Sequence, residues 1–256
     1  MTQVGLQLYT VRDAMEQDFE GTLRKIAALG YQGVEFAGYF GRTAEQVKAI
    51  LDETGLIALG AHTPYVRLRD ALDEEIAFNK AIGNTTLIMP YLEEKERHRW
   101  HDIFEDMDKI GQRCADAGVT FCYHNHEFEL TQHLDGRPVL DVMFSKLPAE
   151  RLQMELDTCW VHYAGLDPVA YITNYADRLP LVHWKDMAKR EDGSAETVEL
   201  GHGEVDIKAI ADAAIQAGAA WLVVEQDYCA GNPLDCIEES MKWIRNYANN
   251  GGNIHV

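Results

Sequence analysis

AGVTFCYHNH, at residues 117–126, has a form that recurs along the chain: a helix end, a glycine, one or two residues and a short apolar strand. The same form occurs in LGYQGVEF (29–36), TGLIALGAH (54–62), IGNTTLIMP (82–90) and AGAAWLVVEQ (217–226). Glycine suits the left-handed conformation in which many helices end. Apolar strands joined by helices are typical of parallel strands that are buried on both faces. The repeat therefore predicts an α/β protein built on a parallel sheet.

The number of such strands indicates a closed barrel. Short apolar, β-rich runs predict eight strands, at residues 4–9, 33–36, 58–62, 86–89, 120–124, 152–157, 181–185 and 221–225. Helical periodicity predicts helices that include 19–29, 44–54, 72–82, 97–117 and 207–217. Division of the 256 residues among eight units gives about 32 each, close to the roughly 250 residues of a (β/α)₈ barrel. Neither GxGxxG nor GxxxxGK, which would favour an open doubly wound sheet, occurs in the chain. We therefore expect one TIM-barrel domain spanning residues 1–256.

The net charge limits the kinds of molecule that we expect the protein to bind. The chain has 23 Lys and Arg against 42 Asp and Glu, which gives a formal net charge of −19 at pH 7. Nucleic-acid phosphates and anionic lipids both require a basic face, so neither is an expected partner. The acidic surplus fits either a solvated surface or carboxylates gathered around a cation, and composition alone does not separate the two.

Targeting and membrane signals are not expected in this chain. No basic patch followed by an apolar stretch is seen at the N-terminus, and no window approaches the roughly 18 apolar residues of a membrane span. The cysteines are odd in number, scattered and without a CxxC pair (Cys114, Cys122, Cys159, Cys229 and Cys236), which is typical of reduced thiols. We expect a cytoplasmic protein with no membrane partner.

Polar residues end seven of the eight expected strands. In strand order they are Gln7, Tyr9 and Thr10; Glu35; His62; His124, Asn125, His126 and Glu127; Glu155 and Asp157; His183, Lys185 and Asp186; and Glu225, Gln226 and Asp227. Desolvation of a lone charge is costly, so buried strands seldom end in ionisable groups without compensation. A barrel brings the carboxyl ends of its strands together at one mouth. The pattern therefore predicts a cluster of carboxylates, imidazoles and one amine.

A mixed set of carboxylates and imidazoles suits one divalent cation, such as Mn²⁺, Mg²⁺, Co²⁺ or Zn²⁺. Asp157, His183 and Glu225 are the last inward-facing candidates on the sixth, seventh and eighth strands, so we expect them to be metal ligands. The fifth strand should supply the fourth ligand. His124 is preferred, and Glu127, just beyond the strand, is a close alternative.

Alternation along the strands places further groups near these ligands. Glu155 shares the face of Asp157, one layer deeper, and Lys185 shares the face of His183. The ammonium of Lys185 could steady an enolate oxygen or a phosphate near a cation, or could pair with Asp186 or another carboxylate.

Several other residues are candidates for contact with the substrate. Trp160 fits either a sugar-stacking platform or helix packing, and His202, between two glycines, fits either a lid contact or a plain turn. Glu35, His62 and His126 complete the candidate set for binding hydroxyl groups. Each of them alone also fits a helix cap, a surface ion pair or exposure to solvent.

Six segments carry a resemblance to a known family: GLQLYTVRDAMEQDFEGTLRKIAALGYQGVEF (5–36), YHNHEFEL (123–130), ELDTCWVHYAGLDP (155–168), LPLVHWKDM (179–187), LGHGEVDIKAI (200–210) and VVEQD (223–227). On these segments the chain resembles the sugar phosphate isomerase/epimerase family, with its xylose-isomerase-like barrel. That family also includes ketose 3-epimerases, inosose dehydratases and endonuclease-IV-type enzymes. The segments span nearly the whole chain in order, and they specify the family more than its substrate.

The resemblance implies one divalent metal held by Glu, Asp, His and Glu on strands five to eight. The last three fall on Asp157, His183 and Glu225, but the phrase ENH of many members reads His124-Asn125-His126 here. Either His124 or Glu127 would then supply the first ligand. In the epimerases the two metal-bound glutamates form the acid/base pair, of which only Glu225 is present at its position. Barrels of this group often pair through their helices, so the resemblance also allows a homo-oligomer.

These observations predict a metal-dependent enzyme that acts on a small carbohydrate, or a sugar phosphate, with a carbonyl group. The metal would chelate the carbonyl oxygen and a neighbouring hydroxyl and stabilise an enediolate. Glu225, with His124 or Glu127 opposite, would transfer the proton. Isomerisation or epimerisation is the predicted reaction, and elimination of water from a keto-sugar or inosose is the alternative. The net charge of −19 disfavours DNA hydrolysis, and a non-catalytic sugar-binding barrel remains the third hypothesis.

Overall fold

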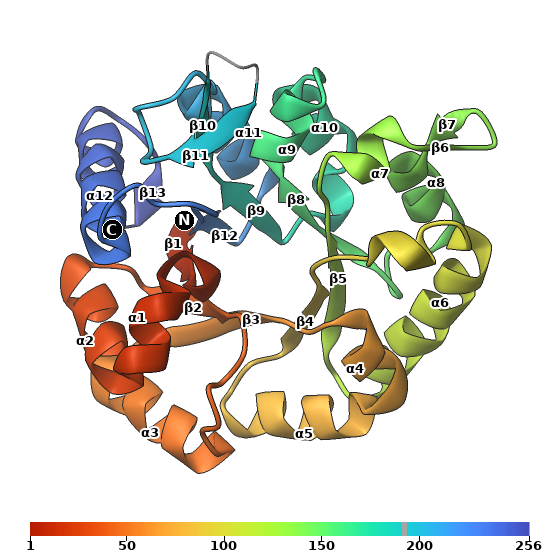
Figure 1. Cartoon of the computed structure of the whole chain (residues 1–256), viewed down its shortest axis with the longest axis horizontal. Helices are drawn as coiled ribbons and strands as arrows, with labels where there is room; N and C mark the ends of the chain where they lie inside the picture. The colour runs from red at the N-terminus through yellow and green to blue at the C-terminus, as the bar shows by residue number, and fades with distance from the viewer. Residues whose placement is uncertain (191–193, 256) are drawn as a thin grey trace.

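Parallel strands form a closed ring in the computed structural model, which describes residues 1–190 and 194–255 (Figure 1). The eight ring strands of this described part are β1 (Thr2–Gln7), β2 (Gly33–Phe36), β3 (Ile57–His62), β4 (Thr86–Met89), β5 (Thr120–His124), β8 (Gln153–Asp157), β9 (Leu181–Trp184) and β12 (Trp221–Val224). They pair in this order, and β12 pairs with β1 to close the barrel. A short strand, β13 (Ile254–His255), also pairs with β1. The predicted (β/α)₈ barrel is confirmed.

Helices surround the ring (Figure 1). They are α1 (Arg12–Gln17), α2 (Phe19–Leu29), α3 (Ala44–Thr54), α4 (Tyr65–Asp70), α5 (Leu72–Ala81), α6 (Trp100–Asp116), α7 (Phe128–Thr131), α8 (Val139–Lys146), α9 (Thr158–Tyr163), α10 (Pro168–Asn174), α11 (Ile207–Ala217) and α12 (Pro233–Asn249). The bounds of α2, α3 and α11 agree with those predicted from periodicity, and α5 and α6 are slightly shorter. Within the described residues, no helix combines the length and the apolar character that a membrane crossing requires.

The helix ends have local causes in the sequence. Thr43 and Gln46 form a capping box at the start of α3, in which each side chain accepts a hydrogen bond from the other residue's backbone N–H. Helices α2 and α3 end at Gly30 and Gly55, whose φ angles are 99° and 73°. A residue with a Cβ would be strained there, so the recurring glycine stops each helix and turns the chain toward the next strand.

Apolar side chains form two cores, one on each side of the strands. The larger core lies between the ring and the helices and includes Leu23 and Ile26 on the inner face of α2. A smaller cluster fills the barrel interior and comprises Leu59, Ile88, Cys122, Leu181, Trp221 and Val223. Three of these, Cys122, Leu181 and Val223, each lie two residues before a polar strand-end residue. This apolar layer therefore lies directly beneath the polar mouth of the barrel.

Two long connections, residues 125–138 and 187–206, leave the strands at the mouth. The first contains α7 and an antiparallel hairpin of β6 (His133–Leu134) and β7 (Arg137–Pro138). The second contains most of an antiparallel hairpin of β10 (Asp186–Lys189) and β11 (Ala195–Val198). The sequence does not predict these hairpins because their strands are short and mix polar with apolar residues. Residues 191–193 of the second connection lie outside the described residues.

Gly60, in β3, leaves room for two interior side chains. A Cβ at this position would lie 2.6 Å from Ile88 Cδ1 and 2.8 Å from Glu35 Oε2. We expect Gly60→Ala to lower the free energy of unfolding by about 1–3 kcal/mol through overpacking, as measured by urea denaturation. Gly231→Ala is a matched control, because a Cβ there meets nothing within 4 Å. Equal losses in the two variants would contradict the packing explanation.

Candidate active site

Four side chains from neighbouring strands converge at the mouth of the barrel. His124 ends β5, Asp157 ends β8, His183 lies in β9 and Glu225 directly follows β12. One nitrogen or oxygen of each lies within 4.8 Å of those of the other three, and all four residues are buried. The sequence predicts these four residues as metal ligands. The rule that side chains alternate along a strand correctly placed all four on the inner face of the barrel.

The chemistry of this group fits a divalent cation. Two carboxylates and two imidazoles are ligands that Mn²⁺, Co²⁺ and Zn²⁺ accept. Asp157 Oδ2 is buried and accepts no hydrogen bond of good geometry, although His124 Nε2 lies 3.7 Å away and Lys185 Nζ 2.9 Å away. Lys185 does not use all the lone pairs of this buried oxygen, and a cation would provide a further partner. Glu127 is in neither of the metal-ligand groups formed by the described residues, which favours His124 as the ligand from β5.

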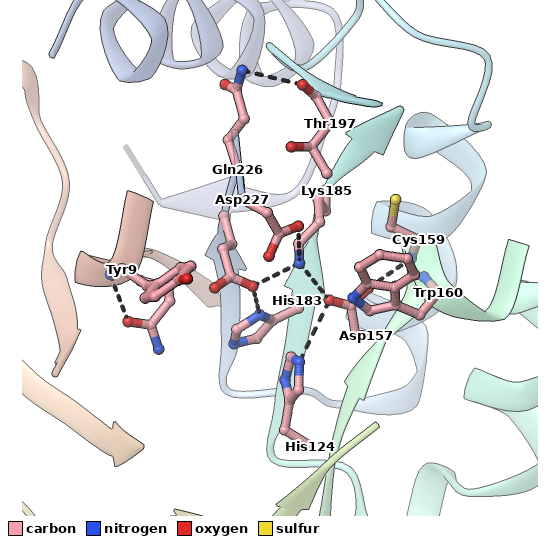
Figure 2. A network of polar contacts seen from close by, with 12 residues as sticks. Tyr9, His124, Asp157, Cys159, Trp160, His183, Lys185, Thr197, Gln226 and Asp227 are labelled. Atoms are coloured by element: carbon pink, nitrogen blue, oxygen red, sulfur yellow. Dashed lines mark hydrogen bonds and ion pairs between the residues drawn. The ribbon is translucent and has the colours of Figure 1, made fainter. Parts of the chain in front are cut away.

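Lys185 lies among three carboxylates at the mouth (Figure 2). Its Nζ is 2.9 Å from Asp157 Oδ2, 2.8 Å from Glu225 Oε2 and 2.9 Å from Asp227 Oδ2. Burial opposes protonation of Lys185, but the carboxylates outweigh it and raise the pKa of the ammonium well above its ordinary value. Three carboxylates and one ammonium leave an excess of two negative charges, which a divalent cation would neutralise.

We expect Lys185→Gln to make the stability of the protein depend on added metal. Loss of the ammonium leaves Asp157 and Glu225 without their buried counter-ion, and this should cost about 3–5 kcal/mol of unfolding free energy in EDTA. Added Mn²⁺ should restore most of that loss, so it should raise the thermal midpoint of the variant more than that of the wild type. Lys208→Gln is the control, because Lys208 pairs with Asp212 at the surface, where such pairs contribute little. An equal effect of Mn²⁺ on both variants would contradict the expectation.

An inner layer of ionisable side chains lies deeper in the barrel. Glu35, in β2, and Glu155, in β8, are fully buried. His62, at the end of β3, places its Nε2 3.0 Å from Glu35 Oε1 and 2.8 Å from Glu155 Oε2. Glu155 Oε2 also contacts His124 Nδ1, and Glu35 Oε1 contacts His183 Nε2. The predicted inward orientation of Glu155 is confirmed, and the structure brings Glu35 and His62 to His124 and His183.

A pocket of about 490 Å³ opens onto these groups. Its polar lining comes from His62, His124, His126, Glu225 and Asp227, and its apolar lining comes mainly from Tyr9, Ala37, Pro64, Pro90 and Tyr91. Tyr9 and Tyr91 are 43% and 40% exposed, and the guanidinium groups of Arg12 and Arg97 lie over their rings. Ring faces beside convergent polar groups form a concave surface suited to a small polar ligand.

Three other predicted substrate-binding residues have different surroundings. His126 lines the pocket, and its buried Nδ1 has no hydrogen-bond partner. Burial and the charge of Lys185 lower the pKa of His126 to about 3. The Trp160 ring lies 5.6 Å from the His126 ring and 5.6 Å from Lys185 Nζ, so it packs behind the pocket lining. His202 is 61% exposed and is not a lining residue of this pocket.

The segment around His202 is shaped by Asp186. The Asp186 carboxylate accepts hydrogen bonds from the backbone N–H groups of Gly201, Gly203 and Val205 at 2.9–3.1 Å. These contacts favour the plain-turn interpretation of the segment. They also use the carboxylate oxygens of Asp186, which was one predicted partner of Lys185. The carboxylates that pair with Lys185 are instead Asp157, Glu225 and Asp227.

A closed parallel barrel with ionisable groups gathered at the carboxyl ends of its strands defines the class of TIM-barrel enzymes. The model of the xylose isomerase-like TIM barrel family matches residues 23–247, and the chain belongs to this family. The resemblance predicted from the sequence is thereby confirmed.

Individual relatives are distant but extend along nearly the whole chain. An inosose dehydratase of Lacticaseibacillus casei is 21% identical over 272 residues, covering 90% of this chain and 89% of that protein. A sugar phosphate isomerase/epimerase of Parabacteroides distasonis has a TM-score of 0.82 at 19% identity, covering 96% of this chain and 98% of that one. The structure of an L-ribulose 3-epimerase has a TM-score of 0.74 at 14% identity, with 98% and 95% covered. The two structural similarities show the fold, and the relatives are carbohydrate-modifying enzymes by name.

Proposed function

We propose that the protein is a divalent-metal-dependent isomerase or epimerase of a small carbohydrate, acting by proton transfer next to a carbonyl group. The proposal is carried by one observation, the convergence of His124, Asp157, His183 and Glu225 within 4.8 Å at the pocket of the barrel. These residues would hold Mn²⁺, Mg²⁺, Co²⁺ or Zn²⁺. Such an ion, when bound, polarises a carbonyl and stabilises the negative charge that develops on its oxygen. The names of the relatives support a carbohydrate as the substrate.

Glu225 is the proposed base. It lines the pocket, and its Oε2 lies 2.9 Å from His183 Nδ1 and 2.8 Å from Lys185 Nζ. Burial opposes its ionisation, but the attraction of the Lys185 ammonium holds the pKa of Glu225 well below its usual range. The carboxylate is therefore ionised and can accept a proton from the carbon beside the carbonyl.

His62 is the proposed acid, and it lines the same pocket. Burial opposes protonation of the imidazole, but Glu35 and Glu155 raise the pKa of His62 to about 10. The surroundings keep the Glu225 carboxylate ionised and the His62 imidazole protonated. The first can therefore accept a proton and the second can donate one. This assignment leaves His124 as a ligand, and it leaves His126 to contact a hydroxyl group.

Dehydration is the second candidate reaction. Elimination of water uses a base for the proton beside the carbonyl and an acid for the leaving hydroxyl, which Glu225 and His62 supply, and curated relatives carry the name inosose dehydratase. Glu225 would take the proton from the carbon beside the carbonyl, and the electrons of that bond would form the double bond. The β-hydroxyl would leave with the proton of His62 as water.

Incubation of the Mn²⁺-loaded protein with keto-sugars and inososes in D₂O tests both candidates. NMR should show deuterium beside the carbonyl together with a new epimer or ketose. EDTA should abolish the exchange, and Mn²⁺ should restore it. Loss of water without any epimer or ketose would decide for dehydration. A metal-loaded protein that neither exchanges the proton nor forms product would contradict both.

A further inference from the structure

His124 and His183, the two histidines of the proposed metal site, each have one ring nitrogen beside a carboxylate of the inner layer. His124 Nδ1 lies 3.0 Å from Glu155 Oε2, and His183 Nε2 lies 2.9 Å from Glu35 Oε1. The opposite nitrogens face the carboxylates of the mouth: His124 Nε2 is 3.7 Å from Asp157 Oδ2, and His183 Nδ1 is 2.9 Å from Glu225 Oε2. The two imidazoles therefore present different nitrogens to the same site.

The inner nitrogens belong to a second group that could hold a cation. His62, His124, Glu155 and His183 also have donor atoms within 4.8 Å of one another. This inner group shares His124 and His183 with the mouth group. A neutral imidazole has one N–H and one lone pair, so each shared histidine can offer a cation only one of its nitrogens. The tautomers of these histidines therefore decide which group receives the cation.

We propose that Glu155 and Glu35 are positioning residues that accept the N–H groups of His124 Nδ1 and His183 Nε2. The lone pairs of His124 Nε2 and His183 Nδ1 are thereby directed to the cation at the mouth. This inference rests on the proposed function, because it takes the mouth group as the metal site. Carboxylates that bind the second nitrogen of a ligand imidazole fix its tautomer and its orientation, and they make it a better ligand.

Contacts around the two carboxylates keep them in place. Gln7 Nε2 donates to Glu35 Oε1 at 2.6 Å, and His62 Nε2 bridges Glu35 and Glu155. Gly60 leaves space for Glu35 Oε2. The mouth group contains two carboxylates, Asp157 and Glu225, and adjoins a third, Asp227, whereas the inner group contains one, Glu155. The unpartnered oxygens Glu35 Oε2 and Glu155 Oε1 make a cation in the inner group the alternative to be tested.

NMR of the Zn²⁺-loaded protein with ¹⁵N-labelled histidine reads the tautomers directly. We expect His124 to carry its proton on Nδ1 and His183 to carry its proton on Nε2, so that the two ligands have opposite tautomers. Protons on His124 Nε2 and His183 Nδ1 would overturn the inference, because the lone pairs would then face the inner group.

Titration with Co²⁺, followed by visible absorption, measures the effect of the carboxylates on the ligands. Glu155→Gln and Glu35→Gln should each bind one Co²⁺ per chain with an affinity about 10–100-fold weaker than the wild type and with a shifted visible band. Glu129→Gln is the matched control. Glu129 is also a fully buried carboxyl, it accepts the His126 backbone N–H at 2.8 Å, and it is in neither cation-binding group of the described residues. Its Co²⁺ affinity and spectrum should equal those of the wild type.

The outcomes separate this inference from the proposed function. A Glu155→Gln variant that matches Glu129→Gln would overturn the positioning role. Loss of Co²⁺ by Glu155→Gln, with Co²⁺ retained by Asp157→Asn, would place the cation in the inner group and overturn the inference while leaving metal dependence intact. A wild-type protein that binds no Co²⁺ would overturn the proposed function itself. Circular dichroism reports the folding of each variant, and the wild-type NMR spectrum decides the question if Glu155→Gln does not fold.

Discussion

We expect Asp157→Asn to lose its divalent ion and its turnover together. Asp157 Oδ2 is the buried oxygen that faces His124 Nε2 and Lys185 Nζ, and an amide NH₂ in its place cannot bind a cation. Four-ligand zinc sites bind with about 10–16 kcal/mol, so loss of one charged ligand should weaken binding by at least about 100-fold. Metal content after gel filtration and the rate of product formation measure both effects.

The variant should keep its fold, which makes the result interpretable. Asp157 Oδ1 caps α9 by accepting hydrogen bonds from the N–H groups of Cys159 and Trp160 at 2.9 and 3.1 Å, and asparagine caps helices as well as aspartate does. Asp206→Asn is the matched control, since Asp206 caps α11 at the surface. Retention of turnover in Asp157→Asn would contradict the proposed metal site. Unchanged sugar affinity, with no turnover in either the variant or the wild type, would support a non-catalytic sugar-binding barrel.

The fold was predictable because each unit carries its own local signals. Helices α2 and α3 end at glycines in the left-handed conformation, and the apolar strands that follow need cover on both faces. The hairpin of β10 and β11 has no such signal, because its strands contain polar residues and only Asp186 and Met187 of β10 and Thr197 of β11 are buried in the structure. Short antiparallel pairs of this kind depend on tertiary contacts rather than on local pattern.

The convergence of the mouth group was predictable because residues two apart on a strand share a face. The same rule gave the inward orientation of Glu155. Contacts between neighbouring strands were beyond this rule: Asp227, after β12, proved to be the third carboxylate at Lys185, after β9, and Gln7 of β1 proved to donate to Glu35 of β2. Both are among the polar strand-end residues of the sequence, but their partners depend on the register between adjacent strands, which alternation along a single strand does not give. His202 lies on a connection, where alternation gives no direction, and the structure places it away from the pocket lining.

We expect Glu225→Gln to abolish proton transfer while leaving a recognisable substrate site. The amide keeps the shape of the side chain beside His183 and Lys185, but it cannot accept the substrate proton. General bases contribute about 10²–10⁴-fold to rates, and exchange of the substrate proton with D₂O should fall within that range. Substrate affinity, measured with saturating Mn²⁺ to offset the weaker metal binding, should change far less.

Comparison with Glu127→Gln identifies which glutamate is the base. Glu127 is the alternative that the sequence leaves open, but it lies outside the metal-ligand groups and the pocket lining of the described residues. We therefore expect Glu127→Gln to retain most of the exchange rate at saturating substrate. A large loss of exchange in Glu127→Gln, with Glu225→Gln still active, would reassign the base to the connection that follows β5. A large loss in both variants would instead indicate two carboxylates acting on opposite faces of the substrate, as epimerisation requires.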